Sequence, residues 1–392
     1  MIQLTVKTER LKPVKMRHPW IFSGALQNIP DGIESGTPVE IVDEHGDFLA
    51  SGYFNSYSQI AVRVWSWQAE EKVDDDFFRR RIAAALKLRQ NYLGADTDAY
   101  RLISSENDFL PGLIVDRYAD YLSVQFHTRG IEFWRDQIVS ALKAELKPKG
   151  IYERSEVRAR GIEGAADQSG LLLGEVPEKV KITENGFKFW VDIIGGQKTG
   201  FFLDQRDKRQ ALAKYAKDKS VLNCFSYTGG FSVYALSAGA KKAVSVDMSQ
   251  SALELAKENI KLNGLDLKKC EFIATDVKKY LRESVQPEEF EVIILDPPAF
   301  IKDRRKIKEG ITGYRHINES AIRLLPPGGI LVTASCSAHL KMPDFRFLVS
   351  EAAGRAGRTL RILESYTHGL DHPQLTAFNE SEYLKCLFAQ ID

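Results

Sequence analysis

The sequence predicts an α/β fold, in which a doubly wound, Rossmann-like sheet is preceded by a β-barrel and a small central α+β domain. Three patterns support this prediction: short alternating strands in residues 1–72, a mixed pattern in 73–187, and a regular strand–helix alternation in 188–392. Apolar strands that alternate with helices are typical of a parallel sheet covered on both faces. A chain of 392 residues is also long enough for two or three domains.

The first 72 residues are expected to form the barrel. Residues 1–7 alternate between apolar and polar, the apolar run 39–43 leads into a turn at 44–47, and residues 60–65 alternate again. Short strands separated by glycine-containing turns predict a small β-barrel.

Residues 73–187 combine helical and strand patterns. Acidic residues open a helical apolar pattern at residue 75, which is a helix-start signal. The expected elements are a helix at 75–93, strands at 113–118 and 121–126, a helix at about 131–146, a strand at 151–154 and a loop at 165–170. This order predicts a small α+β domain.

The C-terminal half alternates regularly. Five apolar runs predict five strands, and helical patterns follow the first two of them. The expected strands are 221–224, 243–247, 271–276, 291–296 and 330–335, with helices that begin after Gly229-Gly230 and span 249–262. Successive strands of this kind predict the parallel sheet.

Composition limits the possible functions. The net charge of +1 excludes a protein that holds nucleic acid by bulk charge, so a nucleic-acid site must be a local basic patch such as residues 7–17 or 302–308. For either patch alone, a solvated surface is the better interpretation. The chain lacks a run of about 18 apolar residues, and its four cysteines form no C-x-x-C pair. We therefore expect a cytoplasmic protein that has no membrane partner, no metal and no disulfide framework.

Polar residues follow the first three strands, at the edge where open α/β sheets bind ligands. The first strand leads into the glycine-containing turn Asn223–Gly230, where missing side chains can let the backbone approach a ligand. Asp247 ends the second strand and is placed to accept from a ribose diol, and Asp276 ends the third and is placed to accept from an exocyclic amine. Together they predict a nucleoside-bearing cofactor, which leaves NAD and S-adenosylmethionine open.

The fourth strand separates these two cofactors. It ends in Asp296-Pro297-Pro298-Ala299-Phe300, where two prolines impose a rigid turn. An acid-Pro-Pro-aromatic turn resembles the motif with which amino-methyltransferases and some cytosine methyltransferases hold a flat base. A dehydrogenase has no use for it, so the sequence favours S-adenosylmethionine.

A candidate nucleophile follows the fifth strand. Cys336 stands between two serines and is expected at the same sheet edge as Asp296. Methylation of cytosine at C5 requires prior attack at C6, and a thiolate is the best side chain for that attack. A nearby positive charge, from the 302–308 loop or the cofactor's sulfonium, is expected to favour the thiolate. The other cysteines, Cys224, Cys270 and Cys386, are expected to be small buried hydrophobic residues.

Five motifs in register resemble the bacterial 23S rRNA cytosine-C5 methyltransferases that carry an N-terminal PUA domain, the large-subunit methyltransferase I family. These are Arg17–Ala25 (RHPWIFSGA), Lys198–Arg206 (KTGFFLDQR), Asn223–Phe231 (NCFSYTGGF), Asp296-Pro297-Pro298 and Ser335-Cys336-Ser337. Ala334 departs from the family pattern, where phenylalanine is common.

The resemblance implies a PUA barrel at 1–72, a central domain at 73–187, a methyltransferase domain at 188–392, and a homodimer. It implies that Cys336 is the nucleophile and that Asp296 supports the base. The predicted cofactor-binding set is Phe201, Asp204, Gln205, Arg206, Asn223, Phe225, Ser226, Tyr227, Gly229, Asp247, Met248, Ser249, Asn263, Asp276, Val277, Asp296 and Pro297.

The expected substrate is 23S rRNA, free or in an assembly intermediate, and its target base must leave the stack to reach the site. Basic side chains would hold phosphates and position the RNA. The predicted RNA-binding residues are Arg17, Trp20, Lys302, Arg304 and Arg305. For Trp20 and the other N-terminal aromatic residues, a place in the barrel core is the alternative.

Two other functions fit the same motifs. A base N-methyltransferase would need the Asp-Pro-Pro turn but no cysteine. A non-catalytic RNA-binding protein of ribosome assembly could keep the methyltransferase fold as a scaffold.

Overall fold

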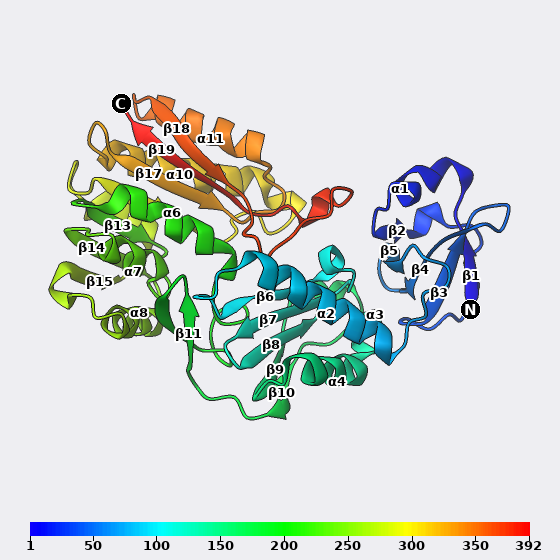
Figure 1. Cartoon of the computed structure of the whole chain (residues 1–392). Helices are drawn as coiled ribbons and strands as arrows, with labels where there is room; N and C mark the ends of the chain where they lie inside the picture. The colour runs from blue at the N-terminus through cyan, green and yellow to red at the C-terminus, as the bar shows by residue number, and fades with distance from the viewer. The chain divides into compact units, whose positions relative to one another are not determined.

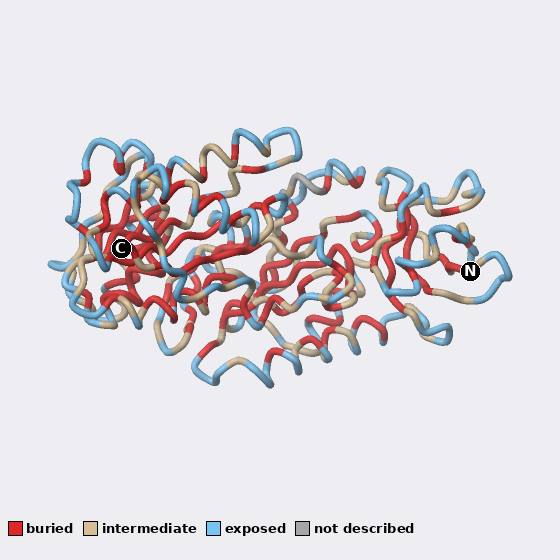
Figure 2. The backbone as a smooth tube through the Cα atoms, turned by 90° about the horizontal axis from the view of Figure 1, so that it is seen from above, coloured by how far each residue is buried: buried red, intermediate tan, exposed pale blue. Residues whose placement is uncertain are grey.

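The computed structural model describes residues 1–392, apart from the side chains of residues 158 and 159. Its chain divides into two compact units. The first unit comprises 1–183, 191–203 and 370–379, and the second comprises 184–190, 204–369 and 380–392. Figure 1 shows the elements along the chain, and Figure 2 shows buried stretches of backbone alternating with exposed ones.

The first unit begins with a five-stranded sheet of order β1-β3-β4-β5-β2 (Figure 1). Its strands are β1 Ile2–Thr5, β2 Trp20–Phe22, β3 Pro38–Val42, β4 Phe48–Phe54 and β5 Ile60–Ser66, with the short helix α1 Leu11–Lys15 between β1 and β2. β1 pairs parallel with β3, and the remaining pairs are antiparallel. The expected strands at the N-terminus are confirmed.

A second five-stranded sheet, of order β10-β9-β8-β7-β6, follows in the same unit. Its strands are β6 Ala99–Ser104, β7 Leu113–Tyr118, β8 Tyr121–Phe126, β9 Gly150–Ser155 and β10 Gln168–Gly174. The long helix α2 Asp75–Tyr92 and the helix α4 Arg135–Leu146 share one core with the sheet, which contains Ile82, Leu142 and Val124.

Two expectations for this region are wrong in detail. The helix expected at 131–146 is two helices, α3 Arg129–Glu132 and α4, because the chain leaves helical geometry between them. The loop expected at 165–170 contains the start of β10, where Gln168 pairs with Ser155. Gly and Ser favour loops locally, but the unpaired edge of β9 provides backbone partners that override this preference.

The second unit contains a seven-stranded sheet of order β15-β14-β13-β16-β17-β19-β18 (Figure 1). The five expected strands are present and parallel: β13 Ser220–Cys224, β14 Lys242–Asp247, β15 Cys270–Ala274, β16 Val292–Leu295 and β17 Ile330–Ser335. The strand order reverses between β13 and β16, which is the position where doubly wound sheets bind ligands at their carboxyl edge.

Helices cover both faces of this sheet. α6 Arg206–Ala216 and α7 Gly230–Ser237 pack on one face, while α9 Val277–Glu283, α10 Ile307–Leu324 and α11 Met342–Arg355 pack on the other. The helix α8 Gln250–Leu262 contacts α7 and β14. The doubly wound fold is therefore confirmed.

The end of the sheet differs from the expected purely parallel arrangement. β19 Lys385–Ile391 pairs antiparallel with both β17 and β18 Leu360–Tyr366. Consecutive strands 18 and 19 lie next to each other without a crossover helix, so they must be antiparallel. A separate two-stranded sheet is formed by β11 Val180–Glu184 and β12 Phe187–Val191, and the short helix α5 spans Arg158–Ile162. Among the described residues, no helix is long and apolar enough to cross a membrane.

Candidate active site

The Asp-Pro-Pro turn and Cys336 meet at the carboxyl edge of the second unit's sheet. β16 and β17 are parallel neighbours, so the residues that follow them emerge side by side. The Cys336 thiol, which is partly buried, donates to the carbonyl oxygen of Pro297 at 3.9 Å between Sγ and O. The two motifs, 39 residues apart in sequence, therefore form one site.

Asp296 is oriented by a buried amide. The Gln205 side chain donates from Nε2 to Oδ1 of Asp296 at 2.8 Å, and Gln205 itself is 3% exposed. Gln205 precedes α6, so the N-terminus of that helix fixes the amide beside the turn. Gln205 is one of the predicted cofactor residues, and its contact with the carboxylate is not indicated by the sequence.

The turn that follows β13 has an unusual backbone. Phe225 and Tyr227 have φ values of 58° and 45°, and Gly229 has 77°. Left-handed conformations are costly for residues with bulky side chains, by about 1–3 kcal/mol each, and they persist only where surrounding contacts impose them. Here Asp247 imposes one of them, because its Oδ2 accepts from the backbone N–H of Tyr227 at 2.9 Å. Strained turns of this kind cluster at ligand-binding sites.

Gly229 is required for packing as well as for its φ angle. A Cβ atom on Gly229 would lie 2.8 Å from Cβ of Ala256 in α8. The sequence predicts that the missing side chain lets a ligand approach, whereas in the structure it lets the helix α8 approach.

The remaining polar groups around this turn suit a nucleoside-bearing ligand. Asp247 also accepts from the Ser249 backbone N–H through Oδ1, at 2.9 Å, which holds its carboxylate at the end of β14. Within the described part of the chain, the buried hydroxyls of Ser226 and Thr228 have no hydrogen-bond partner. A buried polar atom without a partner is costly, and a polar ligand can satisfy it.

Other predicted cofactor residues surround the same edge. Asp276 ends the loop after β15 and caps α9, where it accepts from Lys279 N at 2.9 Å. Val277 is buried directly behind it, and Met248 is 75% exposed next to Asp247. Asp204 is buried, and its Oδ2 accepts from the Tyr383 hydroxyl at 2.7 Å.

Three predicted residues have a different position or environment. Asn263 lies at the C-terminal end of α8, about 20 Å along the helix from Ser249. Its amide donates to and accepts from the backbone of Lys188, at 2.7 and 2.9 Å. Asn223 is fully buried and donates to Ser232 Oγ, and Phe201 belongs to the first unit, where its N–H donates to the Tyr118 hydroxyl.

Residues around Cys336 that the sequence analysis did not identify come from α10 and β19. The Tyr314 hydroxyl lies 2.9 Å from Ser337 Oγ, and the Lys385 ammonium donates to the Ser337 carbonyl at 2.6 Å. Lys385 is a fully buried cation, which the sequence analysis had not expected beside Cys336. A lysine inside the apolar run Leu384–Phe388 was the available sequence signal.

The basic 302–308 loop begins close to the cysteine. Ile301 donates its backbone N–H to Ser337 Oγ at 3.1 Å, which ties the start of the loop to the residue after Cys336. Lys302, Arg304 and Arg305 follow and are exposed. The positive charge of this loop therefore lies beside the carboxyl edge of the sheet.

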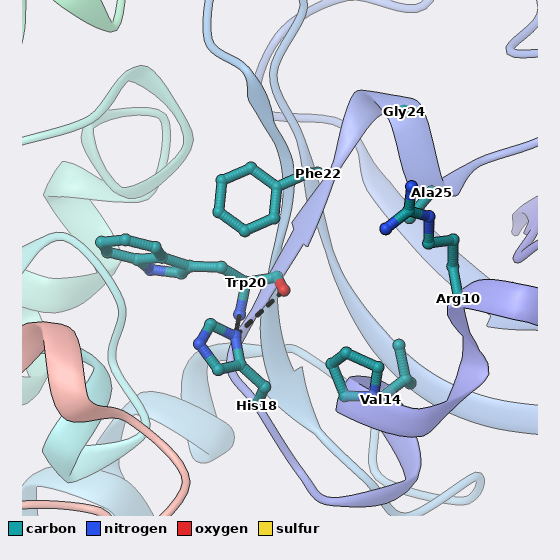
Figure 3. Close-up of a pocket in the computed structure, with 8 residues that line it drawn as sticks. Arg10, Val14, His18, Trp20, Phe22, Gly24 and Ala25 are labelled. Carbon is teal, nitrogen blue, oxygen red and sulfur yellow. Dashed lines mark hydrogen bonds between the residues drawn. The ribbon is translucent and has the colours of Figure 1, made fainter.

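The first unit carries a pocket of about 400 Å³ next to α1 and β2, shown in Figure 3. Its walls include Arg10, His18, Trp20 and Phe22, and the Phe22 ring is 45% exposed. Trp20 is held in place, since its Nε1 donates to Glu106 at 2.7 Å. Trp20 is thus a fixed part of the pocket wall.

The four cysteines have different environments. Burial raises the pKa of Cys224 and of Cys386 far above the usual range, as expected for buried hydrophobic residues. Cys270 differs from the expectation because it is only partly buried, and burial raises its pKa to about 11. It lies at the start of the edge strand β15, which leaves one side open.

Two family models match the chain. Residues 4–67 match the PUA-like domain, and residues 162–388 match the S-adenosylmethionine-dependent methyltransferase family. The cofactor is therefore S-adenosylmethionine.

Similar structures agree with this assignment. A chain from Streptococcus mutans described as a SAM-dependent methyltransferase superposes with a TM-score of 0.83 at 25% identity, and 100% of each chain is covered. A methyltransferase structure complexed with SAH gives a TM-score of 0.85, also at 25% identity and with 100% of each chain covered.

Curated relatives are considerably more similar. The ribosomal RNA large subunit methyltransferase I of Tolumonas auensis is 47% identical over 386 residues, covering 97% of each chain. Its counterpart in Aeromonas salmonicida is 47% identical over 381 residues, covering 96% of each chain. Since relatives this similar span nearly the whole sequence and the methyltransferase model matches more than half of it, the chain belongs to the ribosomal RNA large subunit methyltransferase I family.

Proposed function

We propose that this protein methylates carbon 5 of a cytosine in 23S ribosomal RNA, and that it does so through a covalent bond between Cys336 and C6 of the base. The observation that carries the proposal is the contact between the Cys336 thiol and the Pro297 carbonyl, which brings a nucleophile to the turn suited to a flat base. The large-subunit rRNA substrate in this proposal is taken from the names of the curated relatives.

The proposed cofactor site lies along the carboxyl edge of β13, β14, β15 and β16. The Asp247 carboxylate would bind the ribose diol, and Asp276 would accept from the adenine amine. The hydroxyls of Ser226 and Thr228 would gain partners. The proposed set is Phe201, Asp204, Gln205, Arg206, Asn223 through its backbone, Phe225, Ser226, Tyr227, Gly229, Asp247, Met248, Ser249, Asp276, Val277, Asp296 and Pro297. Asn263 is omitted, because its side chain is bonded to Lys188.

In the proposed reaction the Cys336 thiolate attacks C6, and the electron pair of the C5–C6 double bond becomes available at C5. Asp296, oriented by Gln205, would hydrogen-bond the N3/N4 edge of the cytosine and stabilise the charge that develops there. The bound cofactor supplies the methyl group that C5 takes up. A base then removes the C5 proton, and departure of the Cys336 sulfur restores the double bond.

Two groups of basic and aromatic residues would contact the RNA. We propose that the PUA-like module, residues 1–72, contributes Arg17 and Trp20, and that the 302–308 loop contributes Lys302, Arg304 and Arg305. The central module, 73–187, and the methyltransferase module, 188–392, complete the chain, which we propose to act as a homodimer.

The principal alternative, a base N-methyltransferase, would use the Asp-Pro-Pro turn without a thiol. The position of Cys336 at that turn favours C5 chemistry.

Replacing Cys336 with alanine distinguishes C5 methylation from N-methylation, because it removes the nucleophile and leaves the cofactor site. We expect Cys336→Ala to bind S-adenosylmethionine in calorimetry and to lose methylation of 23S rRNA by at least about 10³-fold. Retained methylation would contradict the covalent mechanism.

A second experiment tests the chemistry directly. RNA that contains 5-fluorocytosine cannot lose a proton from C5, so the covalent complex should persist on a denaturing gel and map to Cys336. The matched control is Cys270→Ser, which alters the other partly buried cysteine and should form the same complex. If the wild-type protein forms no adduct, C5 chemistry is ruled out.

A further inference from the structure

Lys385 occupies an unusual position for a lysine. It is the first residue of β19, it pairs with Ser335 at the end of β17, and its side chain is completely buried. A buried ammonium loses its hydration, and this is tolerated only where other groups compensate for the charge. Lysine is rarely buried unless it is paired.

The hydrogen bonds of Lys385 do not supply a carboxylate. Its Nζ donates to two backbone carbonyls, those of Ser337 at 2.6 Å and Tyr383 at 2.9 Å. An ammonium has three N–H donors. Among the described residues, two of them bond backbone carbonyls and the third bonds neither a carbonyl nor a carboxylate. The bonds to both carbonyls fix the cation against the segment that contains Cys336.

Cys336 and Glu382 are the neighbouring groups whose negative charge can compensate this ammonium, and Cys336 has the larger effect on the pKa of Lys385. Burial lowers the pKa of Lys385 to about 8, and the negative charge of Cys336 opposes this and raises it. The lysine therefore carries its positive charge below about pH 8, which includes neutral pH.

We propose that Lys385 is the positioning residue that holds Cys336 as a thiolate through the charge of its ammonium. The inference rests on the proposed function in so far as it explains how the nucleophile is activated. Unlike the 302–308 loop, Lys385 is fixed inside the domain, so this activation does not depend on bound RNA.

Other titratable groups surround the pair. Tyr314 in α10 bonds Ser337. Burial and the charge of Cys336 both raise the pKa of Tyr314, so its hydroxyl stays neutral at neutral pH. Lys341 donates to the Glu382 carbonyl at 3.3 Å, and these two residues act on Lys385 with opposite sign. Asp296 at the adjacent turn adds a negative charge, which disfavours a thiolate. Lys385 is the cation bonded to the segment that carries Cys336.

The test measures the rate at which iodoacetamide alkylates Cys336 between pH 5.5 and 9.5, by peptide mass spectrometry on the full chain without RNA. Lys385→Gln keeps a donor for the Ser337 carbonyl and removes the charge. An ordinary thiol is only a few per cent ionised at pH 7. We expect Lys385→Gln to slow alkylation at pH 7 by about tenfold or more and to move the midpoint of the pH profile upward by at least about one unit. Lys385→Arg should restore most of the wild-type rate.

The matched control is Lys208→Gln, which replaces another buried lysine that donates to a backbone carbonyl, that of Asp204. It should leave the Cys336 profile unchanged. If Lys385→Gln fails to fold by circular dichroism, Lys385→Arg together with Lys385→Met provides the comparison. An identical pH profile in wild type and the neutral variant would overturn the inference.

The 5-fluorocytosine experiment distinguishes this inference from the proposed function. Alkylation that depends on Lys385, without a covalent RNA adduct, would support the proposed effect of Lys385 on Cys336 and contradict the C5 mechanism. An adduct at Cys336, with an alkylation rate that does not depend on Lys385, would support the C5 mechanism and contradict the proposed effect of Lys385.

Discussion

Gly229 illustrates how one residue can be constrained twice. Its φ of 77° disfavours any side chain, and an added Cβ would meet Ala256 at 2.8 Å. The strain and the clash should add, because the backbone of α8 cannot move away without disturbing its own packing.

We expect Gly229→Ala to lower the free energy of unfolding by about 2–4 kcal/mol and to weaken S-adenosylmethionine binding. Gly264→Ala is the matched control: its φ is 66°, and no atom lies within 4 Å of its added Cβ. The control should cost only about 1 kcal/mol. Urea unfolding and calorimetry measure both effects, and equal losses for the two variants would mean that the helix contact is unimportant.

Single residues also show the limit of sequence analysis at the site. The sequence predicted that Cys336 and Asp296 share one edge, because both follow strands of a parallel sheet. It could not predict that Gln205 holds Asp296 or that Lys385 lies beside Cys336, because both contacts join segments distant in sequence.

The helix α9 depends on a residue that is also predicted to bind the cofactor. Asp276 caps the helix, because its Oδ1 accepts from the backbone N–H of Lys279. Capping needs only a side-chain oxygen, whereas recognition of an amine donor is stronger with a charged acceptor.

The two roles of Asp276 can therefore be separated. Asp276→Asn should keep the cap and leave the free energy of unfolding within about 0.5 kcal/mol of wild type, while the affinity for S-adenosylmethionine falls by about tenfold. Asp276→Ala should lose both the helix cap and the contact with the cofactor, and its free energy of unfolding should fall by about 1 kcal/mol. Thermal unfolding and calorimetry provide the readouts. Unchanged affinity in both variants would remove Asp276 from the proposed cofactor site.

At the level of strands, prediction succeeded where the local pattern and the tertiary partner agree. The parallel strands β13, β14, β16 and β17 of the second unit are buried along most of their length, since both faces of the sheet are covered there. β10 and β18 were missed because their composition is mixed and most of their side chains are exposed or half-buried. β19, which is buried between β17 and β18, was also missed although its composition is apolar.

Across the first unit, one buried ion network joins the N-terminal sheet to the segments that follow it. Arg63 in β5 bonds Glu106 at 2.6 Å and Glu163 at 2.8 Å, and all three side chains are less than 10% exposed. Removing the arginine would leave two carboxylates buried together without their cation.

We expect Arg63→Met to lower the free energy of unfolding by about 3–5 kcal/mol. The exposed pair of Arg80 and Asp76, at 3.1 Å, offers the control, and Arg80→Met should cost less than about 1 kcal/mol. Urea unfolding followed by tryptophan fluorescence reports on both, since Trp20 and Trp65 lie in the N-terminal sheet. A loss below about 1 kcal/mol for Arg63→Met would show that the network does not stabilise the unit.

The doubly wound fold and the pairing of the Asp-Pro-Pro turn with Cys336 were predictable from the sequence, and the structure contains both. Both follow from the spacing of apolar residues along the chain and from the rule that residues after parallel strands emerge at one edge of the sheet, where ligands bind. The contacts that hold these groups could be identified only in the folded protein: Gln205 bonds Asp296, Asp247 bonds the strained turn, and Lys385 bonds the residue after the thiol. The reason is physical, since a buried polar contact depends on where two distant segments meet in space, and no local pattern in either segment encodes that meeting.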